Sequence, residues 1–138
     1  MDLGLTGKTA VVTGGSKGIG LAVVRGLAGA GVRVVTGARR SSAELDELVR
    51  TGQVEFRPTD LSAPDGPAAL ADAAGDRIDI LVNNVGGAPA RTGGFLSISD
   101  DDWLATLNLD LMAAIRTTRS VLPRMLPKRT VTSGTTSG

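Results

Sequence analysis

Short apolar runs and amphipathic stretches alternate along this chain. Four runs of aliphatic and β-branched residues, each closed by glycine or by polar residues, predict buried strands. These runs are residues 8–13, 32–36, 54–56 and 78–82. The stretches that follow them predict helices at residues 19–30, 42–51, 64–75 and 103–122. The alternation indicates an α/β fold with right-handed crossovers and a parallel sheet covered by helices on both faces.

Polar residues mark the expected helix ends. Ser41, with Glu44 three positions later, predicts a capping box at the start of the second helix. Ser99 predicts the cap of the longest helix, whose first turn holds aspartates that favour the positive end of the helix dipole. Pro123 predicts the end of that helix. The apolar positions of the long helix are interpreted as packing positions: Leu104, Leu107, Leu111, Ile115 and Leu122.

Composition argues against several kinds of chemistry. At 138 residues the chain fits one domain, and its scarce aromatic residues imply a core of Val, Leu, Ile and Ala. The net charge of +1 gives no global field, so no nucleic-acid partner is expected. Cysteine and histidine are absent, which argues against disulfides, thiol chemistry and a metal site. With no secretory signal pattern and no apolar run of membrane-spanning length, we expect a cytoplasmic protein without membrane contact.

A glycine-rich turn follows the first strand directly. Glycines at 14, 18 and 20 form the pattern T-G-x-x-x-G-x-G between a predicted strand and a predicted helix. Such a turn directs backbone N–H groups and a helix N-terminus toward one point, which suits a phosphate group. The alternative is a glycine-rich connection that binds nothing, but the flanking strand and helix favour phosphate binding. Polar residues at the carboxyl ends of the neighbouring strands are expected near the same point.

Three motifs resemble, in order and spacing, those of the short-chain dehydrogenase/reductase family. They are the glycine pattern, Asp60-Leu61, and Asn83-Asn84-Val85-Gly86, which matches the family's N-N-A-G with valine for alanine. The resemblance covers residues 5–126 and implies the N-terminal half of a Rossmann-type doubly wound sheet with strand order 3-2-1-4. Residues 1–126 would then form an incomplete NAD(P)-binding domain. Residues 127–138, rich in Thr, Ser and Gly, would form a tail or the start of a fifth strand.

The resemblance implies a nicotinamide dinucleotide cofactor, and the charges favour NADP(H) over NAD(H). An acid after the second strand would hold the 2′-hydroxyl of NAD, but this chain has Gly37-Ala38-Arg39-Arg40 there. Arg39 and Lys17 could bracket a 2′-phosphate; alternatively the arginines are solvated loop charges. In the family, the Asp-Leu motif contacts adenine and the asparagine motif passes under the nicotinamide ribose. The candidate cofactor-binding residues are Gly14, Ser16, Lys17, Gly18, Ile19, Gly20, Arg39, Arg40, Asp60, Leu61, Asn83, Asn84, Val85 and Gly86.

The catalytic pair that the resemblance implies does not occur in the sequence. Family members use a serine, a tyrosine and a lysine, the last two in a Y-x-x-x-K turn, whereas this chain contains no tyrosine. Ser133 resembles the family serine, yet a serine without its partner base is inert, so it is a weak candidate. The family's helical asparagine aligns with Asp110, a second weak candidate. Either Asp110 substitutes for the family's asparagine, or the alignment of this helix with the family is shifted; Asn108 lies two residues earlier.

Three functions fit these residues. By resemblance the chain is an NADP(H)-dependent oxidoreductase that transfers hydride between nicotinamide and a small-molecule carbonyl or alcohol, truncated before Y-x-x-x-K and inactive alone. The alternatives are a non-catalytic NAD(P)-binding sensor and an interaction module completed by a partner chain. An apolar sheet edge and the long helix are expected to promote self-association. Whether the chain is itself an enzyme is therefore an open question at this point.

Overall fold

The computed structural model describes residues 4–84 and 93–126. Parallel strands form one four-stranded sheet in the order β3-β2-β1-β4, which confirms the predicted strand order. The strands are β1 (Thr9–Thr13), β2 (Arg33–Ala38), β3 (Val54–Pro58) and β4 (Ile80–Val82). The helical elements are α1 (Gly18–Gly29), α2 (Ala43–Arg50), α3 (Gly66–Ala74), the 3-10 turn η1 (Phe95–Ser97), α4 (Asp100–Leu107), the π-helical turn η2 (Asn108–Met112) and α5 (Ala113–Met125).

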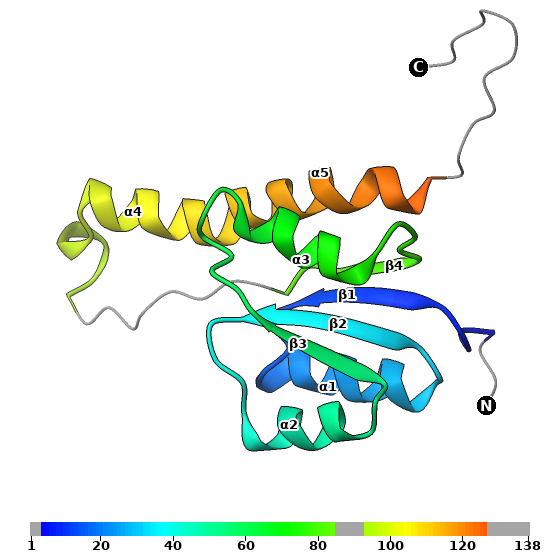
Figure 1. Cartoon of the computed structure of the whole chain (residues 1–138). Helices are drawn as coiled ribbons and strands as arrows, with labels where there is room; N and C mark the ends of the chain where they lie inside the picture. Colours follow the sequence, from blue (N-terminus) through cyan, green and yellow to red (C-terminus); the bar gives the residue numbers. More distant parts are fainter. Residues whose placement is uncertain (1–3, 85–92, 127–138) are drawn as a thin grey trace, which may run out of the picture.

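Helices cover both faces of the sheet. Helices α1 and α2 lie on one face, and α3 and α5 lie on the other (Figure 1). Side chains alternate along a strand, so β1 contributes Val11 to the core on the α3 and α5 side, and Ala10 and Val12 to the core on the α1 side. All three are fully buried. This two-sided burial explains why the first strand is an unbroken apolar run rather than an alternating one.

The second helix begins one residue later than the sequence indicates. Ser42, not Ser41, is its N-cap: the Ser42 hydroxyl accepts a hydrogen bond from the Leu45 backbone N–H at 3.1 Å. The Ser41 hydroxyl instead donates to the Asp46 carboxylate at 2.6 Å. Two adjacent serines offer equivalent caps, and the burial of Leu45 against the sheet selects the register that uses Ser42.

The predicted long helix is interrupted by η2 and runs past Pro123. Its start agrees with the prediction, because Ser99 and Asp102 form a capping box with bonds of 3.2 and 3.1 Å. Its end lies two residues past Pro123, near the predicted place, since α5 continues to Met125. A proline in the last turn removes one hydrogen bond, and its fixed φ is compatible with a helix. Arg124 holds this turn in place: its carbonyl accepts from Ile78 N–H at 3.0 Å and its guanidinium pairs with Asp72 at 2.5 Å.

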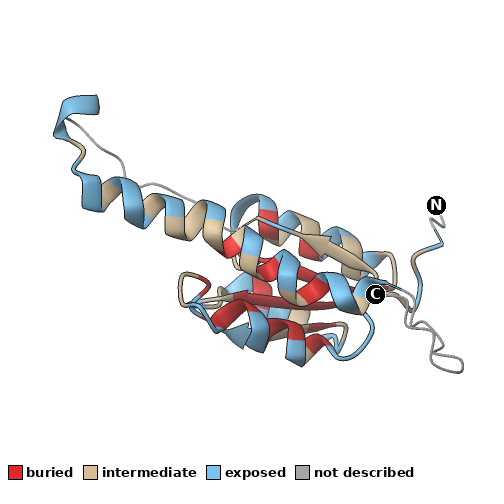
Figure 2. Cartoon of the chain, turned by 90° about the horizontal axis from the view of Figure 1, so that it is seen from above, coloured by how far each residue is buried: buried red, intermediate tan, exposed pale blue. Residues whose placement is uncertain are grey.

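The face of the long helix that packs is not the one assigned from the apolar pattern. The residues buried against the sheet and α3 are Ala113, Thr117 and Val121. The leucine and isoleucine positions are exposed instead, at 64, 48, 53, 39 and 47% for Leu104, Leu107, Leu111, Ile115 and Leu122. Figure 2 shows buried residues gathered in the sheet and the helix faces against it, while α4 reaches beyond the sheet. Small residues permit the close approach of α5, which leaves the larger apolar side chains outside.

Several sequence predictions fall on parts of the chain that the structure does not describe. Val85, Gly86 and Ser133 lie outside the described residues, as does the segment 127–138. Across residues 4–84 and 93–126, no helix is long and apolar enough to cross a membrane. Over the same ranges, the acidic side chains form no group that could hold a metal ion.

Candidate functional site

A hollow of about 850 Å³ lies beyond the carboxyl ends of the strands. Its size is in the range of small-molecule and cofactor sites. The structure brings these predicted residues together in its lining: Gly14, Ser16, Lys17, Gly18, Ile19, Arg39, Arg40, Asp60, Leu61 and Asn84. The lining also includes residues that were not predicted: Ala38, Ser41, Ser42, Thr59 and Leu109. The first four lie within two positions of predicted residues, whereas Leu109 comes from η2, and no pattern in the sequence indicates it.

The glycine turn has the backbone that its residue types require. Gly14 and Gly18 have φ values of 70° and 60°, a region that side chains strongly disfavour. Gly20 is needed for a different reason: a Cβ atom there would overlap the Gly14 carbonyl oxygen and the Asn84 side-chain amide. Helix α1 therefore begins directly against the turn. Its first two residues, Gly18 and Ile19, line the hollow, and a helix N-terminus is suited to binding a phosphate group.

Side chains from β2 and from the end of β4 fix the turn from behind. The Thr36 hydroxyl donates to Val12 O at 2.7 Å and accepts from Gly15 N–H at 3.1 Å. The Asn84 amide donates to Gly14 O at 3.2 Å, and the Asn84 N–H donates to the Thr13 hydroxyl at 2.8 Å. Asn84 thus contacts the turn and also lines the hollow. A role for Thr36 was not predicted, because a threonine inside a β-branched run resembles an ordinary strand residue.

Asn83 and Gly20 belong to the predicted set but contact the site indirectly. Asn83 is exposed and donates to the Thr118 hydroxyl on α5 at 3.2 Å. This contact connects the end of β4 to the long helix. Gly20 is buried beneath the turn and permits its close packing. Asp110, the weak catalytic candidate, lies in η2 next to Leu109 and is half-buried.

The charged groups of the hollow are mostly basic. Lys17, Arg39 and Arg40 are exposed at its rim, and Asp60 is its acidic group. The Asp60 carboxylate accepts from the Ser62 hydroxyl at 2.5 Å and from the Ser62 N–H at 3.0 Å. These two bonds, together with the Arg39 guanidinium at 3.6 Å, hold the pKa of Asp60 below its usual value. The site therefore combines a net positive rim with an ionised hydrogen-bond acceptor, which suits a ligand with phosphate and amino groups.

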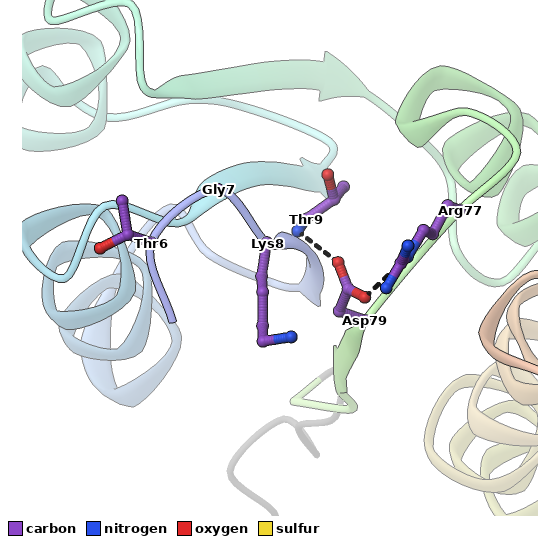
Figure 3. A pocket seen from close by; sticks show the side chains of 6 residues that line it. All are labelled: Thr6, Gly7, Lys8, Thr9, Arg77 and Asp79. Atoms are coloured by element: carbon purple, nitrogen blue, oxygen red, sulfur yellow. Dashed lines mark hydrogen bonds and ion pairs between the residues drawn. The ribbon is translucent and has the colours of Figure 1, made fainter. Parts of the chain in front are cut away.

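A second, smaller hollow of about 280 Å³ lies at the opposite ends of the strands. Figure 3 shows Asp79 among its lining residues, between Thr9 and Arg77. One Asp79 oxygen accepts from the Thr9 N–H at 3.0 Å and the other from the Arg77 guanidinium at 3.2 Å. The Thr9 bond is the main cause that lowers the pKa of Asp79, and the Arg77 side chain adds to it. Because its two oxygens bond to Thr9 and Arg77, Asp79 joins the start of β4 to β1.

Comparison with known proteins agrees with this geometry. The sequence model of the short chain dehydrogenase family matches residues 8–134. This chain belongs to the short-chain dehydrogenase family. It is 34% identical over 133 residues to the uncharacterized oxidoreductase YvrD of Bacillus subtilis, an alignment that covers 93% of the chain and 50% of that protein. The chain spans about half the length of the curated relatives it matches.

Solved structures of the family share the fold. The Pseudomonas aeruginosa RhlG/NADP active-site complex is similar with a TM-score of 0.74 and 34% identity, over 89% of this chain and 49% of that one. The L-sorbose reductase of Gluconobacter frateurii, solved with NADPH and L-sorbose, is similar with a TM-score of 0.77 and 34% identity, over 91% and 50% of the two chains. The family resemblance and the Rossmann-type fold expected from the sequence are thus confirmed.

Proposed function

We propose that the hollow at the carboxyl ends of the strands binds NADP(H), and that the chain supplies the cofactor-binding region of an NADP(H)-dependent oxidoreductase. The single observation that carries the proposal is the glycine turn, which faces the same hollow as Lys17, Arg39 and Arg40. The residues fit the group: Gly14 and Gly18 have the positive φ values of a tight turn that lines the hollow, and the basic side chains at the rim match phosphates.

Each end of the cofactor has candidate partners. Backbone N–H groups of the glycine turn would bind the pyrophosphate, and Lys17 and Arg39 would bind the 2′-phosphate. The Asp60 carboxylate and the Leu61 N–H would bind adenine, as in the family. Asn84, at the end of β4, would lie toward the nicotinamide ribose, with Ser16 and Ile19 at the turn itself. When bound, nicotinamide accepts or supplies the hydride, and the protein supplies its orientation.

The preference for NADP(H) rests on the residues that end β2. Ala38 is followed by Arg39 and Arg40, whereas NAD-binding folds usually place a carboxylate near this point to hold the ribose hydroxyls. Both arginines line the hollow. A guanidinium can bind a phosphate through two parallel hydrogen bonds, which a hydroxyl cannot reproduce. Several similar structures hold NADP or NADPH, and this supports the same preference.

The reaction we propose for the whole enzyme is hydride transfer between nicotinamide and a small-molecule carbonyl or alcohol. The 138 residues contain no tyrosine, which is the family's proton donor. We therefore propose that this polypeptide by itself binds the cofactor without turnover, with Asp110 and Ser133 as weak catalytic candidates. The same observation supports a second function, a dinucleotide-binding module that acts as a sensor or that a partner chain completes.

Equilibrium titration tests the proposal directly. We expect the purified chain to bind NADPH with a dissociation constant in the micromolar range and to bind NADH at least about tenfold more weakly, since a lost charge-assisted bond costs about 1.5–3 kcal/mol. Bound NADPH should not be oxidised by a broad panel of aldehydes and ketones. Failure to bind either cofactor would overturn the proposal. Binding together with turnover at rates typical of dehydrogenases would contradict the proposed lack of catalysis and would still support the proposed cofactor-binding site.

A further inference from the structure

Two side chains of the long helix bind the same backbone carbonyl. Asn108, at the start of η2, donates from its amide to Ser62 O at 3.0 Å. Arg116, on α5, donates from its guanidinium to Ser62 O at 3.4 Å and to the Asn108 amide oxygen at 3.1 Å. The three groups are half-buried and form a closed triangle, which we call the Ser62 network.

The Ser62 network continues to the acidic group of the hollow. The N–H and the hydroxyl of Ser62 donate hydrogen bonds to the Asp60 carboxylate, and the Ser62 carbonyl accepts hydrogen bonds from Asn108 and Arg116. Every polar group of Ser62 is therefore used, on one side for the carboxylate and on the other for the helix. Since Asp60 is exposed at the hollow, its position depends on these bonds rather than on packing.

The π-helical turn explains how residues eight positions apart meet. In a regular α-helix, side chains at positions 108 and 116 would point roughly 80° apart, because each residue turns the helix by about 100°. A π-helical turn accommodates one extra residue, which reduces that difference to about 20°. The same turn places Leu109 in the lining of the hollow. Such turns are rare in proteins, and those that do occur are often found at functional sites.

We propose that Asn108 and Arg116 are positioning residues for the adenine end of the cofactor site. The proposal rests on the proposed function, because it assigns adenine to Asp60 and Leu61. The two side chains touch neither the hollow nor the cofactor; they act through Ser62 on the orientation of Asp60. Arg116 carries this role as a hydrogen-bond donor to the Ser62 carbonyl and to the Asn108 amide oxygen.

The test separates the adenine end from the nicotinamide end. Variant N108D replaces the donor amide by a carboxylate of the same size, and R116Q removes the charge and shortens the donor side chain. R119Q is the control, because Arg119 is exposed one turn further along the same helix. Binding of NADPH, of adenosine 2′,5′-bisphosphate and of nicotinamide mononucleotide is measured by NMR titration. We expect N108D and R116Q to bind the first two ligands about five- to tenfold more weakly and the third unchanged. R119Q should match the wild type for all three.

The other outcomes are equally decisive. Wild-type affinity of N108D and R116Q for adenosine 2′,5′-bisphosphate would overturn this inference alone, and so would an equal loss for nicotinamide mononucleotide, which indicates general damage. Failure of the wild type to bind any of the ligands would overturn the proposed function and this inference together. Amide hydrogen exchange at residues 60–63, faster in both variants than in R119Q, should accompany the loss of affinity. If one variant does not fold, the other decides the result.

Discussion

The hydroxyl of Thr36 accepts a hydrogen bond from the backbone N–H of Gly15, so a side chain of β2 determines the path of the chain after β1. The bond measures 3.1 Å, and the same hydroxyl donates to Val12 O at 2.7 Å. Thr36 is fully buried. Without this hydroxyl, the Gly15 N–H at the base of the glycine turn would lose its partner in the interior, which is costly.

Replacing Thr36 by valine keeps the shape of the side chain and removes both hydrogen bonds. We expect T36V to lower the free energy of unfolding by about 1–3 kcal/mol and to weaken NADPH binding, because the turn loses its anchor. T36S keeps the hydroxyl and loses one methyl group, so it should cost no more than about 1.5 kcal/mol and bind as the wild type does. Urea denaturation and NADPH titration of both variants check this. Equal NADPH affinity of T36V and T36S would contradict a role for the hydroxyl in shaping the turn.

The sheet and the glycine turn could be predicted because local sequence and tertiary context agree there. The run that ends at Gly14 must be buried on both faces, so its composition reports its position. The carboxyl ends of parallel strands meet at one edge, so Arg39, Asp60 and Asn84 could be expected together before their contacts were known.

The helix of residues 100–125 could not be predicted to the same depth. Its apolar residues repeat at helical spacing, yet the face that packs is the one with Ala113, Thr117 and Val121. Periodicity shows that a face is apolar and does not tell what covers it. The Ser62 network depends on two long-range hydrogen bonds, whose partners are separated by 46 and by 54 positions in the sequence. No local sequence pattern predicts such contacts, nor the π-helical turn that accompanies them.

Glycine-to-alanine substitutions in α1 should have opposite effects at two positions. A Cβ atom at Gly20 would overlap the Gly14 carbonyl and the Asn84 amide, so the turn must shift. We expect G20A to destabilise the fold by about 3 kcal/mol and to abolish NADPH binding. Gly26 is exposed in the same helix, and an added Cβ there meets no atom within 4 Å. G26A should therefore stabilise the fold by about 0.5–1 kcal/mol through helix propensity, with unchanged binding. Thermal unfolding and cofactor titration measure both, and a stable G20A that binds NADPH would contradict the role of Gly20.

Arg39 should determine the discrimination between the two cofactors. In its ion pair with Asp60, the Arg39 side chain is 75% exposed and the Asp60 side chain 50% exposed. Removing this pair should therefore change the free energy of unfolding by no more than about 0.5 kcal/mol. R39Q should weaken NADPH binding by about tenfold or more and change NADH binding by less than about twofold, because NADH lacks the 2′-phosphate. R25Q, an exposed arginine on α1 outside the hollow, is the matched control and should leave both affinities unchanged. If R39Q weakens NADH and NADPH equally, the 2′-phosphate is not its ligand.

Asp79 should make the fold sensitive to acid. Its pKa is lowered in the folded chain, chiefly by the Thr9 N–H, so its carboxylate stabilises the fold above the ordinary carboxyl pKa. That stabilisation is lost as the pH falls from about 4 through the lowered value. D79N should be less stable than the wild type at pH 7 and should show a shallower loss of stability between pH 4 and pH 2. D76N, an exposed aspartate in the same loop, should retain the wild-type acid profile. Urea denaturation at several pH values measures these slopes, and parallel profiles for D79N and wild type would contradict the assignment.

The exposed apolar face of the long helix should make the isolated chain self-associate. Leu104, Leu107, Leu111 and Ile115 are 64, 48, 53 and 39% exposed, so α4, η2 and α5 each present large apolar side chains to solvent. We expect sedimentation velocity to give species larger than the 14.0 kDa chain, with a fraction that increases with concentration and is not reduced by salt, since apolar burial is not screened. L104K and L111K should shift the chain toward the monomer. A22K, which adds the same charge on the exposed side of α1, should not, and a wild-type chain that stays monomeric at high concentration would contradict the expectation.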